Sequence, residues 1–276
     1  MNAAIIGLVA ETSIHVGSGQ AAGAIDLPVA REKTTDYPVI PGSGLKGALR
    51  ERAEEAWGLE DRRVLQVFGE PERAGDVSFS DARLLLLPVR SLQGHFRWVT
   101  CPYILERYRR DCVLAERPLP EFRLAEIENG AALADETETL FLEELTFSAR
   151  AFDLSAVVST LEPLVYHPEL RLRLRRRLVI VNDHEFSYFA RYGLPVDARN
   201  VLDDETKTSR NLWYEEVVPP DTVFYALLLA RPDRREALKQ LRALFDERPH
   251  VRVGGNETVG QGWCAVSWWG SGGEEG

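Results

Sequence analysis

The sequence predicts an α+β fold whose elements follow in the order strand, helix, strand, long insertion, strand, helix, strand. Three observations predict this order. Apolar runs with the length of buried strands stand near both ends of the chain and at two places between them. Two segments repeat apolar residues at helical spacing, each after one of those runs. The 276 residues, 45% of them hydrophobic, are enough to bury a sizeable core, as one large domain or two small ones.

The first strand, helix and strand are predicted in the N-terminal third. Residues 3–10 form an apolar run that predicts an opening strand. Apolar side chains recur at helical spacing over residues 45–57, and Ser43 is the predicted N-cap of that helix. Residues 76–87 begin with alternating apolar side chains and end as a continuous apolar run, which predicts a buried strand that Pro88 ends.

The second strand, helix and strand are predicted in the C-terminal quarter. Residues 222–230 predict a strongly apolar strand, and residues 232–245 a helix with an apolar stripe. The glycine-rich loop GGNETVGQG, residues 254–262, leads into a last strand over residues 263–269. Before these elements, polar residues within 198–216 run into Leu-Trp-Tyr, the pattern of a protruding hairpin. The order is that of a ferredoxin-like (RRM-like) βαββαβ core.

The long insertion gives weaker signals. Residues 91–180 suggest irregular structure packed on the core, with a helix within residues 152–164. The acidic segment 111–144 is expected to be mostly loop. Residues 171–183, RLRLRRRLVIVND, place four arginines on one face if they are extended. That face is either a basic strip that contacts phosphates or a solvated sheet surface.

The charge distribution keeps a nucleic-acid partner open in spite of a net charge of −10. Segment 111–144 holds ten acidic and two basic residues, a net of −8, so the remainder of the chain is close to neutral. A phosphate backbone responds to the local potential rather than to the total. Three cysteines without metal-site spacing, no apolar run of about 20 residues and no secretion signal together favour a reduced cytoplasm.

Two stretches hold candidate chemistry. Residues 15–33 form a glycine loop with Gly17, Gly19 and Gly23, followed by Asp26 between two apolar neighbours. Taken alone, Asp26 either holds chemistry or caps a turn. In the second stretch, Lys46 lies in the first turn of the predicted helix, where a cation opposes the helix dipole unless an anion is bound there. Lys46 is thus a phosphate ligand or an ordinary solvated lysine.

Several common types of active site are excluded because the sequence lacks their motifs. The glycine loop lacks the Gly-Lys-Ser/Thr ending of a P-loop, and no strand-to-helix step follows it as a dinucleotide fingerprint requires. The sequence has no GxSxG elbow, no HExxH and no Cys/His zinc spacing. What remains is a combination of three features: a glycine loop after the first strand, the helix PGSGLKGALR, and a glycine-rich loop before the last strand.

With these three features the chain resembles the RAMP superfamily of CRISPR proteins, and more narrowly the multi-copy backbone subunit of the type III-B Cmr effector complex. The stretches that carry the resemblance are spread over nearly the whole chain: LVAETSIHVGSG, IDLPVAREKTTDYPVIPGSGLKGALR, DVSFSDARLLLLPVRSLQGHFRWVTCPY, LVIVNDHEFSYF, NLWYEEVVP and GGNETVGQGW. The segments IDLPVAREK and FRWVTCPY are distinctive of this subfamily.

The resemblance implies an architecture and a function. Residues 1–90 and 217–276 would form an RRM-like RAMP palm, and residues 91–216 an insertion that includes a thumb hairpin at about 198–212. The subunits would form a filament along the CRISPR RNA. Their thumbs would interrupt the guide–target duplex at six-nucleotide intervals, and each subunit would cut the target RNA opposite its thumb with Mg²⁺ or Mn²⁺. The implied partners are the CRISPR RNA, complementary target RNA, copies of the chain itself and other Cmr subunits, with no membrane.

The resemblance also implies roles for single residues. Asp26 matches the catalytic, metal-binding aspartate, Lys46 beside Ser43 matches the lysine that contacts guide phosphates, and His15 lies near the nuclease site. At the thumb tip the chain departs from the family, with Lys207 in place of glycine and Asn211 in place of a small residue. The full predicted RNA-binding set adds the loop glycines and their polar neighbours: His15, Gly17, Ser18, Gly19, Ser43, Lys46, Arg50, Gly255, Asn256, Gly260 and Gly262.

Two rival functions stay open on the sequence. One is a structural filament subunit without chemistry. The other is a RAMP-type guide-processing nuclease in which His15 acts as a metal-independent base.

Overall fold

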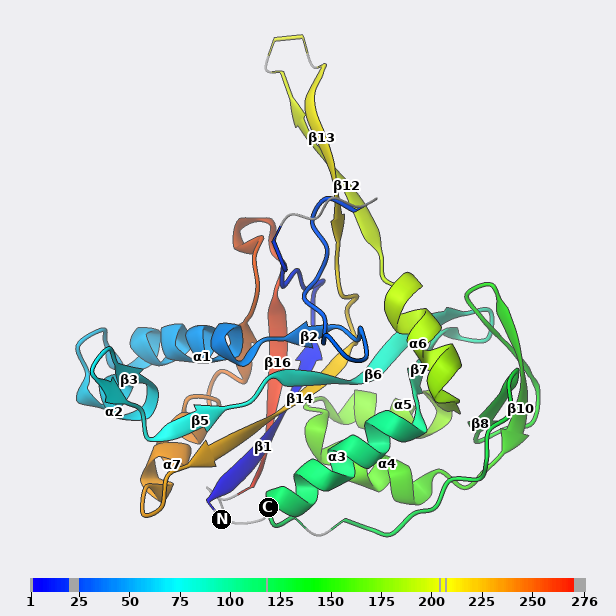
Figure 1. Ribbon diagram of the computed structural model, residues 1–276, viewed down its shortest axis with the longest axis horizontal. Coiled ribbons are helices and arrows are strands. Elements are labelled where there is room, and N and C mark those ends of the chain that lie inside the picture. The colour runs from blue at the N-terminus through cyan, green and yellow to red at the C-terminus, as the bar shows by residue number, and fades with distance from the viewer. Residues whose placement is uncertain (1, 20–24, 118, 204, 207, 271–276) are drawn as a thin grey trace.

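A computed structural model of the chain describes residues 2–19, 25–117, 119–203, 205–206 and 208–270. Within these residues the protein is a mixed α+β structure with a long hairpin that projects from the body (Figure 1). Two residues named in the sequence analysis lie outside the described residues: Gly23 of the first glycine loop and Lys207, which was assigned to the thumb tip. The tail 271–276 lies outside them as well. No helix in the described ranges is long and apolar enough to cross a bilayer.

The core sheet is organised around strand β1 (Ala3–Ala10), in which all eight residues are buried. It pairs antiparallel with β16 (Trp263–Gly270) on one side and with β14 (Val223–Ala230) on the other. β14 in turn pairs antiparallel with β5 (Val77–Phe79) and β6 (Ala82–Ser91). An unbroken apolar run such as AAIIGLVA fits a strand that is covered on both faces.

Two helices connect these strands, as their apolar spacing predicts. Helix α1 (Gly42–Trp57) follows the short strand β2 (Val39–Ile40), and helix α7 (Arg235–Ala243) follows β14. The buried side chains of α1 recur every fourth residue, at Leu45, Leu49 and Ala53, which gives one apolar stripe. The smaller elements near these helices are α2 (Arg62–Phe68), β3 (Gly69–Glu70), β4 (Arg73–Ala74), β15 (His250–Arg252) and the 3₁₀ turn η2 (Glu257–Val259).

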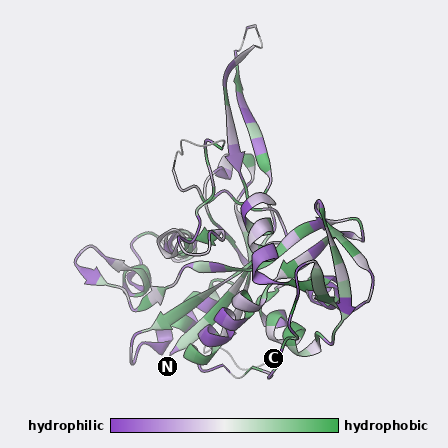
Figure 2. Cartoon of the chain, turned by 45° about the vertical axis from the view of Figure 1, so that its right-hand side comes forward, coloured by the Kyte–Doolittle hydropathy of each residue, from purple (hydrophilic) through white to green (hydrophobic). Residues whose placement is uncertain are grey.

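The second half of the molecule is built on the far end of β6, which continues the sheet to β7 (His95–Thr100). Buried hydrophobic residues line this half, and its strands and helices carry many of them (green in Figure 2). Its elements are α3 (Pro102–Leu114), β8 (Ala131–Ala134), β9 (Thr139–Leu142), β10 (Leu145–Ala151), α4 (Ser155–Leu161), η1 (Glu162–Leu164), α5 (Pro168–Arg177), β11 (Leu178–Val181) and α6 (Asp183–Tyr192). The predicted irregular structure over residues 91–180 is therefore wrong, whereas the predicted helix within 152–164 is confirmed.

The strand predicted over residues 76–87 begins and ends at different residues in the structure. It is divided at Ser80 and Asp81 into β5 and β6, and β6 passes through Pro88 to Ser91. Pro88 lies opposite Trp98 of β7, and its neighbours Leu87 and Val89 are also in register with that strand. A proline removes only one hydrogen-bond donor, so pairing on both sides of it can carry a strand through.

The arginine-rich stretch forms helix α5 rather than a strand, so neither predicted arginine face exists. Its alternation of arginine and leucine has a period of two, but Pro168 stands in the first turn and arginines in the last, both of which favour a helix. Only Leu174 of this helix is buried, and Leu172 is exposed. The extended part is confined to the apolar residues of β11.

The acidic segment 111–144 is less of a loop than predicted. It begins in the last turn of α3 and contains both β8 and β9. Asp111 is buried and accepts hydrogen bonds from Arg83 (Nη1 to Oδ2, 2.5 Å) and from Tyr225 (Oη to Oδ2, 2.7 Å). Burial next to this carboxylate raises the pKa of Tyr225 far above its usual range.

The predicted hairpin is confirmed. Strands β12 (Val196–Leu202) and β13 (Ser209–Glu216) pair antiparallel from Val196 opposite Glu216 to Leu202 opposite Ser209. The pair extends well beyond the rest of the molecule, with its base next to the N-terminal loop that follows β1 (Figure 1). Its outer residues are exposed because no other element covers them.

Candidate functional site

Asp26 lies at the base of the hairpin. Its segment runs parallel to β13, where Leu27 N–H donates to Tyr214 O (3.1 Å) and Glu216 N–H donates to Leu27 O (3.0 Å). The Asp26 carboxylate accepts a hydrogen bond from Tyr214 N–H (2.8 Å to Oδ2), a contact that spans 188 residues of sequence. The side chain is exposed to solvent. Asp26 is therefore an accessible acid held at the hairpin base, and its bond is not that of a local turn cap.

His15 lies on the other side of the same strand end. It is buried, and its Nδ1–H donates to Glu216 O (2.8 Å), because a carbonyl oxygen can only accept. Its Nε2 faces Gly17, where an added Cβ would lie 2.9 Å from that nitrogen. Burial and this bond give His15 a structural position behind the hairpin base.

The C-terminal glycine loop packs directly on His15. Gly255 N–H donates to His15 O (2.8 Å), and a Cβ on Gly254 would lie 2.4 Å from that oxygen. Gly254 also has φ +85°, so both its space and its backbone require glycine. The structure thus brings the first and last glycine-bearing loops together, although they stand at opposite ends of the sequence.

Of the remaining predicted residues of the C-terminal loop, two form hydrogen bonds within the protein and one lies at an exposed turn. The Asn256 side chain donates to the buried Glu215 carboxylate and to Gln261 Oε1 (3.0 Å). Gly262 N–H donates to Ser13 O (2.9 Å). Gly260 has φ +82° and open space around it. Asn256 and Gly262 therefore fix the loop, while Gly260 lies at its exposed turn.

The first glycine loop returns alongside the Asp26 segment. Ser18 donates to Pro28 O from its N–H (3.1 Å) and its hydroxyl (3.3 Å), and Gly17 forms a β-bridge with Val29. Gly19 has φ +95°, and none of the described residues places an atom within 4 Å of where its Cβ would be. Residues 17–19 are exposed, so their backbone is accessible to a ligand.

Helix α1 begins two residues earlier than predicted. Pro41 occupies the N-cap position, and Ser43 is an exposed residue of the first turn that caps nothing. The first N–H of the helix, that of Gly42, donates to Asp81 Oδ1 (2.7 Å). An aspartate from the turn between β5 and β6 thus takes the capping role, which spacing within the helix could not indicate.

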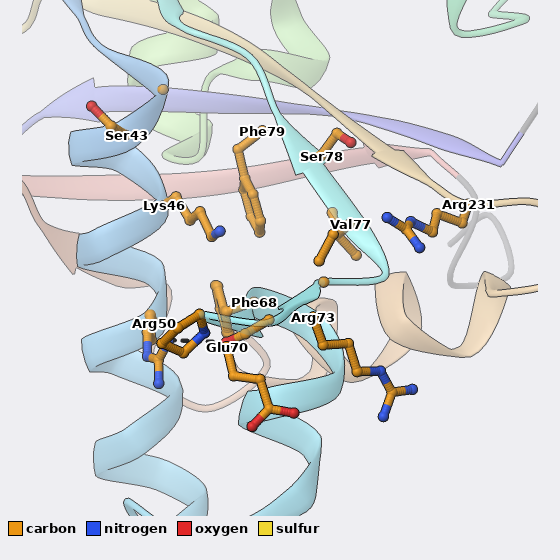
Figure 3. Close-up of a pocket in the computed structure, with 15 residues that line it drawn as sticks. Ser43, Lys46, Arg50, Phe68, Glu70, Arg73, Val77, Ser78, Phe79 and Arg231 are labelled. Carbon is orange, nitrogen blue, oxygen red and sulfur yellow. Dashed lines mark hydrogen bonds between the residues drawn. The ribbon is translucent and has the colours of Figure 1, made fainter.

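A cleft of about 460 Å³ lies between α1, the β3–β4 hairpin and β5. Lys46 reaches into it from α1, and Arg231, just after β14, reaches in from the opposite side (Figure 3). Arg50 also lines it but is paired with Glu54 (Nε to Oε1, 2.8 Å) and donates to Gly69 O. Phe79 lies at the inner wall and stacks on the buried Phe68, with ring centroids 5.5 Å apart.

Sequence reasoning missed Arg73 and Arg231 as members of this cleft. Within the described part of the chain, neither of them nor Lys46 forms an ion pair. The only signal was a basic residue at the end of an apolar strand, which is too common to select Arg231. The cleft therefore presents three cations that form no ion pair within the described residues, together with one acid, Glu70, in the same lining.

A metal site made of protein side chains alone is absent from the described residues, which contain no group of three or more His, Cys, Asp or Glu side chains able to hold an ion together. Asp26 offers an exposed carboxylate, one oxygen of which already accepts the Tyr214 N–H. A divalent ion at Asp26 would have to take its other ligands from water and from bound RNA, which suits Mg²⁺ because it readily keeps waters.

Comparison with known proteins places this arrangement in a class. A model of the RAMP superfamily matches residues 8–265. A curated relative from Pyrococcus furiosus, the CRISPR system Cmr endoribonuclease Cmr4, is 33% identical over 284 residues, which cover 97% of this chain and 96% of the relative. The chain belongs to the RAMP superfamily and, within it, to the Cmr4 family.

Solved structures agree with this placement. The crystal structure of oligomeric Cmr4 from Pyrococcus furiosus superposes with a TM-score of 0.79 at 29% identity and covers 97% of both chains. A chain of the type III-B Cmr-β complex bound to cognate target RNA has the same fold, with a TM-score of 0.76 at 22% identity and 96% of both chains covered. A second curated relative, known from its sequence comparison, is the CMR subunit Cmr4 of Saccharolobus solfataricus. It is 24% identical over 293 residues, which cover 94% of each chain.

Proposed function

We propose that this protein is the guide-RNA-binding backbone subunit of a type III-B CRISPR effector complex and that it cleaves target RNA paired to the guide. The observation that carries the proposal is the exposed carboxylate of Asp26 at the base of a projecting hairpin. Membership of the Cmr4 family supports it, because the Pyrococcus relative is named an endoribonuclease and has been crystallised as an oligomer. Copies of the chain, other Cmr subunits, the CRISPR RNA and its target are the proposed partners.

The proposed architecture is a ferredoxin-like palm of residues 1–90 and 217–276, with residues 91–216 as an insertion that ends in the thumb. The strand order β16-β1-β14-β6, with all neighbours antiparallel, supports the palm because it is the order that two interleaved strand–helix–strand units produce. The β12–β13 hairpin supports the thumb. β6 itself joins the palm to the insertion, so the two parts share one continuous strand.

The proposed guide-binding surface has two kinds of contact. Exposed backbone at residues 17–19 lets phosphates approach the N–H groups of Gly17 and Gly19, and the exposed residues Gly255 and Gly260 leave space for the guide beside them. Ser43 and Lys46 add hydroxyl and cationic donors near the start of α1, and Arg50, which is paired with Glu54, lies one turn beyond Lys46. Neither set reads bases, so sequence specificity would come from pairing between guide and target.

The proposed cleavage uses position more than protein chemistry. The 2′-hydroxyl of RNA is an internal nucleophile, and a nucleotide splayed out of the duplex by the thumb can align it with the adjacent phosphate. Asp26 would hold Mg²⁺ or Mn²⁺ together with water and RNA oxygens; the bound ion supplies charge that stabilises the phosphorane-like transition state. The protein's own residues hold the Asp26 segment to β13 and keep the carboxylate exposed at the hairpin base.

The test is Asp26→Asn in the assembled complex with guide and target RNA. Asparagine keeps an oxygen that can accept the Tyr214 N–H, so assembly and target binding should be unchanged, while cleavage should fall by about 10³-fold or more. Asp36→Asn is the matched control, because Asp36 is a half-exposed acid later in the same segment with φ +65°, which asparagine tolerates. Cleavage by the Asp26→Asn complex at the wild-type rate would contradict the proposal.

A further inference from the structure

Glu216, the last residue of β13, is a junction between the hairpin and the loops beneath it. It is only 3% exposed. Its N–H donates to Leu27 O (3.0 Å), and its carbonyl accepts from His15 Nδ1 (2.8 Å). Through its backbone alone, Glu216 therefore contacts the stretch 15–33 at two places, at its start and at the Asp26 segment.

The Glu216 carboxylate adds two further bonds to the Asp26 segment. Oε2 accepts the Val29 N–H (3.1 Å), and Oε1 accepts from Arg31 Nη2 (2.7 Å). Arg31 is itself fixed at its other nitrogen, which donates to Asp36 O and to Ala190 O, both at 2.7 Å. Because Ala190 belongs to α6, the pair joins the hairpin, the Asp26 segment and the second half of the molecule.

These bonds fix the Asp26 segment over a short distance along the chain. Asp26 is bonded to Tyr214, Leu27 to Tyr214 and Glu216, and Val29 and Arg31 to the Glu216 side chain. Two segments held at successive points move as one body. A buried ion pair adds little net stability over an apolar pair of the same volume, whereas its directional bonds constrain geometry.

We propose that Glu216 is a positioning residue for RNA cleavage: with Arg31 and Val29, it holds the Asp26 segment at a fixed place relative to the hairpin. The inference rests on the proposed function. The hairpin would set where the RNA is splayed, and the Asp26 carboxylate would act at that place. The consequence of the proposal is that the position of the carboxylate relative to the hairpin stays fixed. Loosening the pair should slow cleavage and spread its position without weakening the capture of target RNA.

The experiment uses the assembled complex with its guide RNA and an end-labelled complementary target RNA. Glu216→Gln keeps an oxygen that can accept the Val29 N–H. It replaces the charged carboxylate that pairs with Arg31 by a neutral amide. We expect the single-turnover rate at saturating target to fall by about 10- to 100-fold, with cuts at neighbouring positions and an unchanged target Kd. Arg31→Lys keeps the charge but loses the forked geometry, so a smaller loss of the same kind is expected.

Asp111→Asn is the control for a purely structural effect. Asp111 is also a buried carboxylate paired with an arginine, but it joins α3 to β6 and β14 rather than to the Asp26 segment. We expect it to lower the melting temperature at least as much as Glu216→Gln does, while the cleavage rate and cut positions stay as in the wild type. Loss of cutting precision in Asp111→Asn as well would overturn the positioning role.

The same experiment includes the wild-type and Asp26→Asn complexes. Their results distinguish a failure of the proposed function from a failure of the positioning role. A wild-type complex that leaves the target intact overturns the proposed function and the positioning role together. Wild-type cleavage, lost in Asp26→Asn but unaltered in rate and position in Glu216→Gln, overturns the positioning role alone. If Glu216→Gln does not assemble, Arg31→Lys decides: slower, less uniform cuts support the role, and wild-type behaviour overturns it.

Discussion

At the base of the hairpin, polar groups are bonded to the protein itself, whereas in the cleft beside α1 the side chains of Lys46 and Arg231 extend into open space. Asp26, His15 and Glu216 each accept or donate a hydrogen bond within the strand and loops that surround them. In the cleft, Lys46 and Arg231 face each other across a space of about 460 Å³ without an ion pair among the described residues.

The difference fits the two tasks proposed for these regions, cleavage at the hairpin base and phosphate binding in the cleft. Cleavage requires one group at one place, and an error of about 1 Å in its position can cost about 100-fold in rate. Binding a polyanion requires charge near its path, and a mobile lysine serves as well as a fixed one. Dense bonding at the hairpin base and free cations in the cleft are what these requirements predict. Substitutions in the two regions should therefore differ in kind and in size.

The largest effect is expected for Gly254→Ala at the hairpin base. An alanine there meets His15 O at 2.4 Å and must adopt φ +85°, so we expect a loss of about 3 kcal/mol in the free energy of unfolding. The measurement is chemical denaturation of the purified subunit. Gly260→Ala is the control: it has φ +82° but open space, so it should cost only about 1 kcal/mol. Equal losses in both variants would show that the close contact does not matter.

An intermediate effect, on binding rather than stability, is expected for Lys46→Ala in the cleft. Loss of one phosphate contact should weaken guide RNA binding and make its salt dependence shallower by about 0.7 in log Kd against log salt per bound subunit. The unfolding free energy should stay the same because Lys46 has no ion pair to lose within the described structure.

The control for Lys46→Ala is Lys239→Ala, which removes the same charge from an exposed position on α7 next to Glu236. Binding titrations of labelled guide RNA at several salt concentrations distinguish the two variants. An identical salt slope for Lys46→Ala and the wild type would argue against a phosphate contact at this position.

The smallest effect, and one of opposite sign, is expected for Gly47→Ala on α1. No described atom lies within 4 Å of its Cβ position, so alanine replaces a poor helix former at an exposed position of the helix at no steric cost. We expect the subunit to gain about 0.5–1 kcal/mol in unfolding free energy. The same denaturation experiment measures it, and a destabilised variant would mean that the helix surface is covered in solution.

Much of the fold was predictable because apolar periodicity is a local signal. Strands β1 and β14, helices α1 and α7 and the hairpin all follow from runs of neighbouring residues. Of the two exceptions, one came from a misleading local pattern and the other from strand pairing that overrode a local signal. The alternation within α5 suggested a strand although Pro168 and the terminal arginines favoured a helix, and β6 passed through Pro88 because its pairing with β7 continued on both sides.

The candidate site was predictable only in part. Asp26, Lys46 and the glycine loops were selected from the sequence, and the structure places Asp26 exposed at the hairpin base and Lys46 in a cationic cleft. Ser43 was given a capping role that belongs to Asp81, because the cap comes from the turn between β5 and β6, which is distant in sequence. Arg73 and Arg231 were missed for the same reason: nothing near them in the sequence marks them as neighbours of Lys46.

The sequence by itself determined the order of the elements, the apolar faces they bury and the residue types available for chemistry, since each of these depends on side chains a few positions apart. Only the tertiary structure decided which of those residues meet. His15 and Glu216 are 201 positions apart, and Asp26 and Tyr214 are 188 apart. Such contacts depend on strand order and register, which the packing of the whole sheet settles and no local stretch of sequence encodes.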